Sequence, residues 1–466
     1  MRATVALIAV LAGLLAPSAA AAAPSSMSLG FLDGAFAGGA ERDVRLDEAA
    51  ALGSSIVRVP TGWAGLSPTR PARPEDPADP AYDWASLDDA VRAADARGLR
   101  VLVSLTGAPA WAEGPGRPSD ANPGTWRPNS TAFGRFATAL GKRYSGRYPD
   151  PRGGTLPRAY AFQPWNEPNL TTYLAPQWVR RGGKYVAEGP RIYRALQAAF
   201  YRGVKAGAPA ALVVTAGTSP FGNPEPGGTR MQPARFWREV LCLSRSLSPR
   251  PCPDPARFDA LSHHPYAIGG PFRRAQNTDD VTVPDLTKLD RIVRRAVATG
   301  RALPRARKRL WVTEISWDSR PPDPEGVPQA THANWLQDAL YVLWEQGVDT
   351  VTWFQVRDKL PEPSYAFTSQ SGVLLADGSP KLAARAFRMP ISLRRPDRRG
   401  RTLVFGRAAK AGTMFVQRAA GGKWRTIAGV QMRRDQVLAR RVPAKSGDRI
   451  RLVLGQTVSL VRSVPR

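Results

Sequence analysis

The sequence predicts an α/β protein: a (β/α)8 TIM barrel over residues 27–390, followed by a small all-β, sandwich-like domain over residues 391–466. Along the first region, eight short apolar segments alternate with longer amphipathic ones, which is typical of repeated βα units closing into a barrel. After Pro390 the segments become short and β-rich, with turns containing Gly, Pro or basic residues, which is typical of a sandwich. A hydrophobic content of 43% excludes a largely disordered chain.

Each of the eight barrel strands is predicted from an apolar run next to turn-forming residues. In chain order they are Leu29–Phe36, Ser55–Pro60, Arg100–Leu105, Ala159–Trp165, Ala211–Ala216, Phe258–Ser262, Arg309–Thr313 and Thr350–Gln355. Helices are predicted over Trp84–Arg97 and Ala330–Gln346, because each has apolar residues at helical spacing and ends at a glycine before the next strand. The glycines after Phe31 lack the spacing of a phosphate-binding loop, so a doubly wound fold is not favoured.

The N-terminus is predicted to be a secretory signal peptide over residues 1–23. A basic Arg2 precedes an apolar run from Val5 to Ala16, and small residues follow as far as Ala23. This apolar run is shorter than the ~20 residues of a membrane span, and no later segment is apolar enough to be one. We therefore expect a secreted protein without a transmembrane segment in the mature chain.

The two cysteines, Cys242 and Cys252, are predicted to form a disulfide, because exported proteins fold under oxidising conditions. Two buried free thiols are the alternative. With three histidines and no Cys/His cluster of metal-ligand spacing, neither a metal site nor a cofactor is expected.

The basic charge is concentrated in the C-terminal domain. The formal net charge of the chain is +28, and residues 391–466 contain 16 Arg, 3 Lys, 3 Asp and no Glu, an excess of 16 positive charges. No nucleic-acid recognition motif is present, and export also argues against nucleic acid as the partner. We expect this domain to hold the protein on an anionic cell wall or polysaccharide. The alternative is a compositional preference for arginine without a function.

The segment QPWNEPN, residues 163–169, supplies the first candidate catalytic residue. Glu167 follows the fourth predicted strand, and charged residues at the carboxyl ends of barrel strands face the catalytic mouth. Pro164 and Pro168 restrict the backbone on both sides of it. A glutamate that merely pairs with an arginine is the structural alternative.

The segment LWVTEISW, residues 310–317, supplies the second candidate catalytic residue. Glu314 follows the seventh predicted strand, which lies across the barrel from the fourth, so the two carboxyl groups are expected to converge. Carboxyl groups about 5–5.5 Å apart cleave a glycosidic bond with retention of configuration, whereas a gap of roughly 6.5–9.5 Å admits a water and gives inversion.

These motifs resemble clan A of the glycoside hydrolases, most closely family 39 or family 5. The resemblance covers the predicted barrel and rests on WNEPN and VTEISW. It implies that Glu167 is the general acid/base, that Glu314 is the nucleophile and that Asn166 binds the sugar 2-hydroxyl. It also implies a retaining hydrolase of O-glycosidic bonds in a poly- or oligosaccharide, acting by double displacement.

Four further positions resemble the supporting residues of the clan. Arg58 resembles the arginine that keeps the nucleophile ionised, and a nearby cation lowers a carboxyl pKa. In the sixth-strand segment LSHHPY, His264 and Tyr266 resemble a His-x-Tyr motif whose tyrosine contacts the nucleophile, and His263 is interpreted as packing. Trp353 resembles the aromatic floor of the sugar site.

Two other functions fit the same residues. One is a non-catalytic carbohydrate-binding or adhesion protein on the same barrel, and the other is a transglycosylase. Neither the sugar nor the choice between exo and endo action follows from the sequence, because the loops at the barrel mouth determine both.

Overall fold

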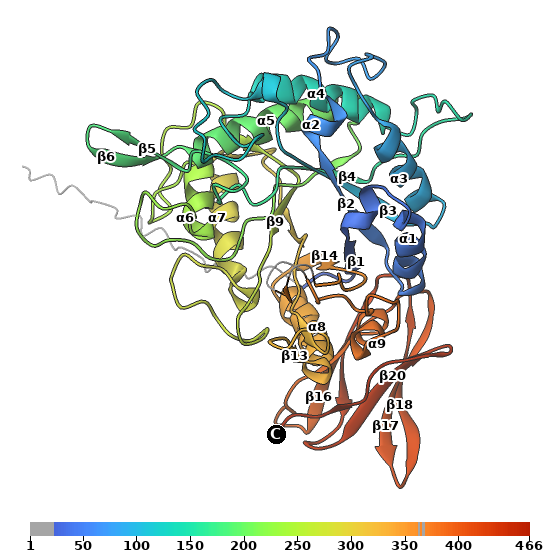
Figure 1. Cartoon of the computed structure of the whole chain (residues 1–466). Coiled ribbons are helices and arrows are strands. Elements are labelled where there is room, and N and C mark those ends of the chain that lie inside the picture. Colours follow the sequence, from blue (N-terminus) through green and yellow to red (C-terminus); the bar gives the residue numbers. More distant parts are fainter. Residues whose placement is uncertain (1–22, 362–363, 366–368) are drawn as a thin grey trace, which may run out of the picture.

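The computed structural model describes residues 23–361, 364–365 and 369–466 (Figure 1). The predicted signal peptide therefore lies outside the described residues, except for Ala23. In the part of the chain that is described, no helix combines the length and the apolar character needed to cross a bilayer.

Eight parallel strands form the predicted barrel. In chain order they are β1 (Ser28–Leu32), β2 (Ile56–Gly62), β3 (Arg100–Thr106), β4 (Ala161–Pro164), β7 (Leu212–Val213), β9 (Ala260–His263), β11 (Arg309–Val312) and β14 (Val348–Phe354). Their order in the sheet is β7-β4-β3-β2-β1-β14-β11-β9, and a parallel bridge between Val214 and Ala260 links its two edges. The strand order and this bridge confirm a barrel rather than an open sheet.

Helices surround the barrel (Figure 1). They are α1 (Arg42–Ala51), α2 (Trp63–Leu66), α3 (Ala85–Asp95), α4 (Ser130–Arg143), α5 (Gly189–Gly207), α6 (Pro233–Val240), α7 (Thr287–Ala298), α8 (Gln329–Glu345) and α9 (Leu382–Arg388). The two predicted helices are α3 and α8, within two residues at each end. Helices α4 and α5 pack closely because Gly203 has no side chain: a Cβ there would lie 2.1 Å from the carbonyl oxygen of Gly134.

The prediction for the first strand was too long. Strand β1 ends at Leu32, and Gly34–Ala37 form a 3₁₀ helix instead. The carboxylate of Asp33 accepts a hydrogen bond from the amide of Ala35 at 3.0 Å, so it caps this helix. Phe36 is buried, as its apolar character requires, but from a helical turn rather than from a strand.

The barrel interior changes from apolar to polar toward the carboxyl ends of its strands. An apolar cluster fills one layer, made of Ile56, Leu102, Ala161, Val214, Ala260 and Trp311. Two residues further along β4, the Gln163 amide donates to the Thr215 carbonyl at 2.7 Å and to Thr313 Oγ1 at 3.1 Å. Thr313 Oγ1 also lies 2.6 Å from Ser262 Oγ. These hydrogen bonds hold four strand ends in register directly beneath the barrel mouth.

The C-terminal domain consists of antiparallel sheets around a core of its own. One sheet contains β15 (Ile391–Leu393), β16 (Arg401–Arg407) and β19 (Val437–Pro443). The other contains β17 (Gly412–Ala420), β18 (Lys423–Met432), β20 (Arg449–Leu454), β21 (Thr457–Val458) and β22 (Arg462–Ser463). These strands confirm that the chain after Pro390 is β-rich. The predicted fold class is therefore confirmed.

The barrel and the C-terminal domain share buried contacts. The side chain of Arg407 is buried, forms an ion pair with Asp435 and donates to the backbone carbonyls of Met27 and Gly53 at 3.3 and 3.0 Å. The amide of Met27 in turn donates to the carbonyl of Asp435 at 2.8 Å. These bonds couple the stability of the barrel to that of the C-terminal domain, because a buried arginine that lost its partners would be costly.

Shorter elements form the loops. They are β5 (Trp178–Arg181), β6 (Lys184–Ala187), β8 (Ala256–Arg257), β10 (Ala302–Leu303), β12 (Ser319–Arg320) and β13 (Val327–Pro328), with 3₁₀ helices Ala110–Ala112 and Val283–Asp285. Cys242 and Cys252 are joined by the predicted disulfide, which closes the loop between α6 and β8.

Candidate active site

Glu167 stands on an unusual backbone turn at the end of β4. Trp165 and Glu167 have φ values of 72° and 34°, in the left-handed region that residues other than glycine rarely adopt. Each such conformation costs about 1–3 kcal/mol and persists only where its surroundings impose it. Here the indole of buried Trp165 donates to the carbonyl of Tyr173 at 2.7 Å, and the amide of Glu167 donates to the carbonyl of Gly217 at 3.0 Å. The turn thereby fixes the direction of the Glu167 carboxylate.

Glu314 follows β11 and is held by two side chains from other strands. The hydroxyl of Tyr266 donates to Oε1 at 2.8 Å, and Arg58 Nη1 donates to Oε2 at 3.0 Å. Arg58, which is buried on β2, also donates to Asn166 Oδ1 at 2.9 Å and to Ser104 Oγ at 3.0 Å. One guanidinium thus orients both Glu314 and the residue that precedes Glu167.

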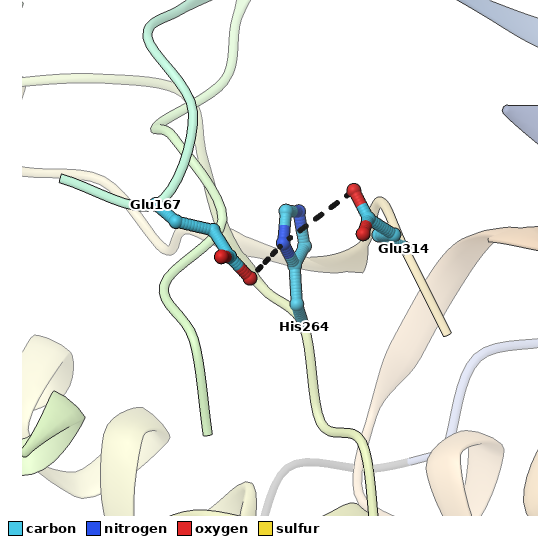
Figure 2. Close-up of side chains that lie close together, drawn as sticks. All are labelled: Glu167, His264 and Glu314. Carbon is cyan, nitrogen blue, oxygen red and sulfur yellow. Dashed lines mark hydrogen bonds and ion pairs between the residues drawn. The ribbon is translucent and has the colours of Figure 1, made fainter. Parts of the chain in front are cut away.

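His264 lies between the two carboxylates (Figure 2). Its Nδ1 is 3.0 Å from Glu167 Oε1 and 3.8 Å from Glu314 Oε2, and its Nε2 is 3.1 Å from Thr313 Oγ1. His264 thus contacts both carboxylates through Nδ1 and the residue after β11 through Nε2. A Cβ at Gly217 would lie 2.0 Å from Nε2, so a glycine at this position makes room for the ring.

One oxygen of each carboxylate and one nitrogen of His264 lie within 4.8 Å of one another. In the described part of the chain this is the one cluster of His, Cys, Asp or Glu close enough to share a metal ion. The donor set fits a cation poorly, because the Glu314 oxygens already receive hydrogen bonds from Arg58 and Tyr266. The same spacing suits two carboxyl groups that act on one bond between them.

The surroundings of Glu314 favour its ionised form. Burial alone would raise its pKa, but the pKa is lowered overall, because His264, the Arg58 guanidinium and the hydrogen bond from Tyr266 outweigh burial. The pKa of the Tyr266 hydroxyl is raised well above its ordinary value by burial and by the Glu314 charge, so Tyr266 remains a donor. A carboxylate that stays charged while it faces a second carboxyl group is suited to act as a nucleophile.

The structure brings six of the seven predicted site residues together and leaves out Trp353. Trp353 is 1% exposed, its indole donates to the carbonyl of Ser371 at 2.8 Å, and its ring packs against those of Trp317 and His332. Alternate residues of a strand point to opposite faces, and Thr352 Oγ1 bonds to the Thr313 carbonyl inside the barrel. Trp353 therefore points outward toward the helices.

Strand alternation also identifies the residue that replaces Trp353. Phe354 shares the inner face of β14 with Thr352 and is partly exposed. An aromatic floor beneath a ligand at the carboxylate pair would thus come from Phe354. The resemblance predicted an aromatic residue on the correct strand, β14, but at Trp353 instead of Phe354, the next position.

Two residues beside the pair were not predicted. Asn169 is fully buried, donates to the carbonyls of Ser219 and Met231 and accepts from the Ser219 amide, so it locks the loop that carries Glu167. Its place in WNEPN was the available signal. Tyr173 has a raised pKa, caused by burial and then by the charges of Glu167 and Glu314. No sequence pattern singled it out.

Comparisons with known proteins support the fold. No protein-family model and no curated protein matches the sequence. A family 39 glycoside hydrolase from Bacteroides cellulosilyticus WH2 matches with a TM-score of 0.53 and 14% identity, covering 90% of this chain and 81% of that chain. GH5_18 from Streptomyces cattleya, in complex with GlcNAc, matches with a TM-score of 0.48 and 18% identity, covering 79% of this chain and 80% of that chain. The match to the family 39 structure, at low identity, confirms the resemblance in fold to this group of glycoside hydrolases.

Proposed function

We propose that the protein is an exported retaining glycoside hydrolase that cleaves O-glycosidic bonds of a poly- or oligosaccharide. The observation that carries this proposal is the pair of carboxylates at one barrel mouth, with an oxygen of each within 4.8 Å of the other. This gap is narrower than the roughly 6.5–9.5 Å at which a water fits between the carboxyl groups of an inverting enzyme. Arg58 and Tyr266 hold Glu314, whose pKa is lowered, so we assign Glu314 as the nucleophile and Glu167 as the acid/base.

In the first step, Glu314 attacks the anomeric carbon and forms a glycosyl ester as the glycosidic bond breaks. Glu167 transfers its proton to the departing oxygen. In the second step, Glu167, now a carboxylate, takes a proton from water, and the hydroxide attacks the anomeric carbon as the ester bond breaks. The Glu314 carboxylate is restored, and the configuration is retained after two inversions.

The surrounding groups position these two residues. Arg58 and Tyr266 hold the Glu314 oxygens. His264, which lies between the two carboxylates, bonds Glu167 (Figure 2). Asn166 Oδ1 accepts from Arg58, so its NH2 group is the donor: one N–H bonds to the Tyr173 hydroxyl and the second can donate to a sugar hydroxyl.

A screen of aryl glycosides and polysaccharides, comparing the parent protein with Glu314→Gln, tests the proposal. Turnover that depends on Glu314 supports it. Sugar binding without turnover in the parent would support the carbohydrate-binding alternative. Products lengthened by an added acceptor sugar would identify a transglycosylase.

Replacing Arg58 by Gln is expected to move the acid limb of the pH profile to higher pH by about 1 pH unit or more. The lowered pKa of Glu314 keeps this carboxylate ionised to lower pH, so activity is lost only when the pH falls through that pKa. Without the cation the pKa rises, and the loss begins at higher pH. The dependence of kcat/KM on pH measures this effect. Arg58→Lys, which keeps the positive charge, is the matched control. If the acid limb of Arg58→Gln did not move, Arg58 would not be the cation that keeps Glu314 ionised.

We also propose that the basic C-terminal domain holds the enzyme on an anionic wall polymer. Arg425 and Arg449 are exposed on the sheet of β17, β18 and β20, where Arg451 stacks over the Trp424 ring at 4.2 Å. Substituting exposed Arg425, Arg440 and Arg449 by Gln is expected to weaken sedimentation with purified anionic cell walls about tenfold at low salt. Aryl-glycoside turnover should be unchanged. Unaltered sedimentation would mean that the charge has no such role.

A further inference from the structure

A pocket lies where the barrel meets the C-terminal domain, and none of its residues takes part in the proposed hydrolysis. Its volume is about 660 Å³, within the range of small-molecule sites. The barrel contributes Phe272, from the loop after β9, and Asp338, from α8. The C-terminal domain contributes residues 393–395 at the end of β15, Arg462 of β22 and Pro465, close to the marked C-terminus (Figure 1).

The charged residues of this lining are three arginines and one aspartate: Arg394, Arg395, Arg462 and Asp338. The Asp338 carboxylate is already occupied. Arg462 Nη2 donates to its two oxygens at 2.9 and 3.1 Å, and Ser392 Oγ donates to Oδ1 at 2.8 Å. Asp338 therefore holds Arg462 in place and neutralises its charge, so the pocket keeps an excess of positive charge from the other two arginines.

The guanidinium of Arg394 is held by aromatic rings rather than by an acid. Its Cζ lies 4.9 Å from the ring centre of Tyr341 and 5.5 Å from that of Phe272. The Tyr341 hydroxyl donates to Glu345 at 2.8 Å, which fixes that ring. In the part of the chain that the structure describes, the guanidinium has neither a carboxylate within 4.0 Å nor a hydrogen-bond acceptor. The rings orient the group, and its N–H donors remain available to a ligand.

Arg395 and Phe272 line the pocket from its solvent side. Arg395 is exposed and, among the described residues, has no carboxylate within 4.0 Å. Phe272 is 51% exposed, so part of its ring can pack against the apolar face of a sugar. A guanidinium binds a carboxylate or a phosphate with paired, charge-assisted hydrogen bonds. Two such groups beside an exposed ring therefore match a sugar that carries an oxyanion.

We propose that this pocket binds an acidic sugar unit of an anionic polymer, with its carboxylate or phosphate on Arg394 and Arg395 and its ring against Phe272. The inference goes beyond the proposed hydrolysis, because it assigns a second binding site to residues outside the carboxylate pair. It rests on the proposed function for the source of the ligand, the anionic wall polymer. It gives the C-terminal domain a defined site for that polymer in addition to the charge spread over its sheet.

Binding to the full chain in the Glu314→Gln background tests the inference without turnover. Calorimetry compares trigalacturonate with its neutral methyl ester, and glucose 6-phosphate with glucose, so the two arms distinguish a carboxylate from a phosphate. We expect at least one acid to bind about tenfold or more tightly than its neutral counterpart, with an affinity that falls as salt rises. The double variant Arg394→Gln/Arg395→Gln should abolish this preference.

Two single variants keep the test independent of folding effects in the double variant. Arg395→Gln changes an exposed side chain and should by itself reduce the preference for the acid about threefold or more. Phe272→Ala should weaken binding of the acid but leave its salt dependence unchanged, because the ring contributes packing and no charge. Arg462 is left intact, since its loss would deprive the buried Asp338 of its partner.

The matched control is Arg398→Gln, an exposed arginine three residues further along that is outside the lining and should change nothing. Equal affinity for each acid and its neutral counterpart, binding of neither acid, or unaltered binding in Arg395→Gln would overturn the inference. Aryl-glycoside turnover by the parent reports separately on the hydrolase proposal. If turnover is absent while the acid preference depends on Arg395, the hydrolase proposal fails and the pocket assignment stands.

Discussion

Replacing Glu314 by Gln is expected to lower kcat/KM by about 10⁴-fold or more for every glycoside that the protein cleaves. The amide nearly matches the shape of the carboxylate but cannot form the glycosyl ester. Since Glu314 lies in a mostly buried setting of Arg58 and Tyr266, no neighbouring carboxylate can take over attack from the same face. Steady-state kinetics on activated aryl glycosides measures the loss.

The control for this prediction is Glu75→Gln, which changes an exposed glutamate on the 62–83 loop and should leave the rate unaltered. Glu314→Gly with added azide identifies the role directly. Azide can enter from the vacated face while Glu167 still protonates the leaving group, so the product should be a glycosyl azide of inverted configuration. Undiminished turnover in Glu314→Gln would show that Glu314 is not the nucleophile.

Replacing Glu167 by Gln is expected to give a loss that depends on the leaving group. Sugar leaving groups need a proton as the bond breaks, so their rates should fall by about 10²–10⁴-fold. Dinitrophenyl leaving groups need none, so ester formation should be nearly unchanged and the ester should accumulate, because water lacks its base in the second step. A burst of dinitrophenol followed by slow turnover is the expected signal.

Azide also distinguishes the roles of the two carboxylates when Glu167 is replaced. In Glu167→Gly it attacks the glycosyl ester from the face that water uses, so the azide product should retain the configuration of the substrate. The matched comparison is Glu314→Gly, for which the opposite anomer is expected. The same anomer from both variants would contradict the assigned roles, although it would leave the fold and the position of the pair unaffected.

The position of Trp353 shows where sequence reasoning reached its limit. The segment TVTWFQ contains adjacent aromatic residues, and a strand directs only one of them inward. Barrel strands are buried on both faces, so the apolar pattern carries no information on which face is which. The hydrogen bond from Thr352 to the Thr313 carbonyl decides the matter in favour of Phe354. The overlong first strand has a different cause, because Asp33 interrupts the apolar run and caps a 3₁₀ helix, from which apolar Phe36 is still buried.

The place of Tyr173 beside the site could not be predicted for a different reason. Tyr173 follows the left-handed turn at Trp165 and Glu167, and its carbonyl accepts a hydrogen bond from the Trp165 indole. Backbone conformations of this kind leave no periodic signal in a sequence.

By itself, the sequence determined the barrel, the β-rich C-terminal domain and the two glutamates at strand ends. It could do so because parallel strands present all their carboxyl ends at one rim, so a strand assignment alone places Glu167 and Glu314 at the same mouth. Only the tertiary structure decided which groups meet them there. Arg58 reaches Glu314 from β2, three strands away, and Tyr266 reaches it from the end of the neighbouring strand β9. Trp353 turns away, because side-chain direction depends on strand phase and loop packing rather than on residue type.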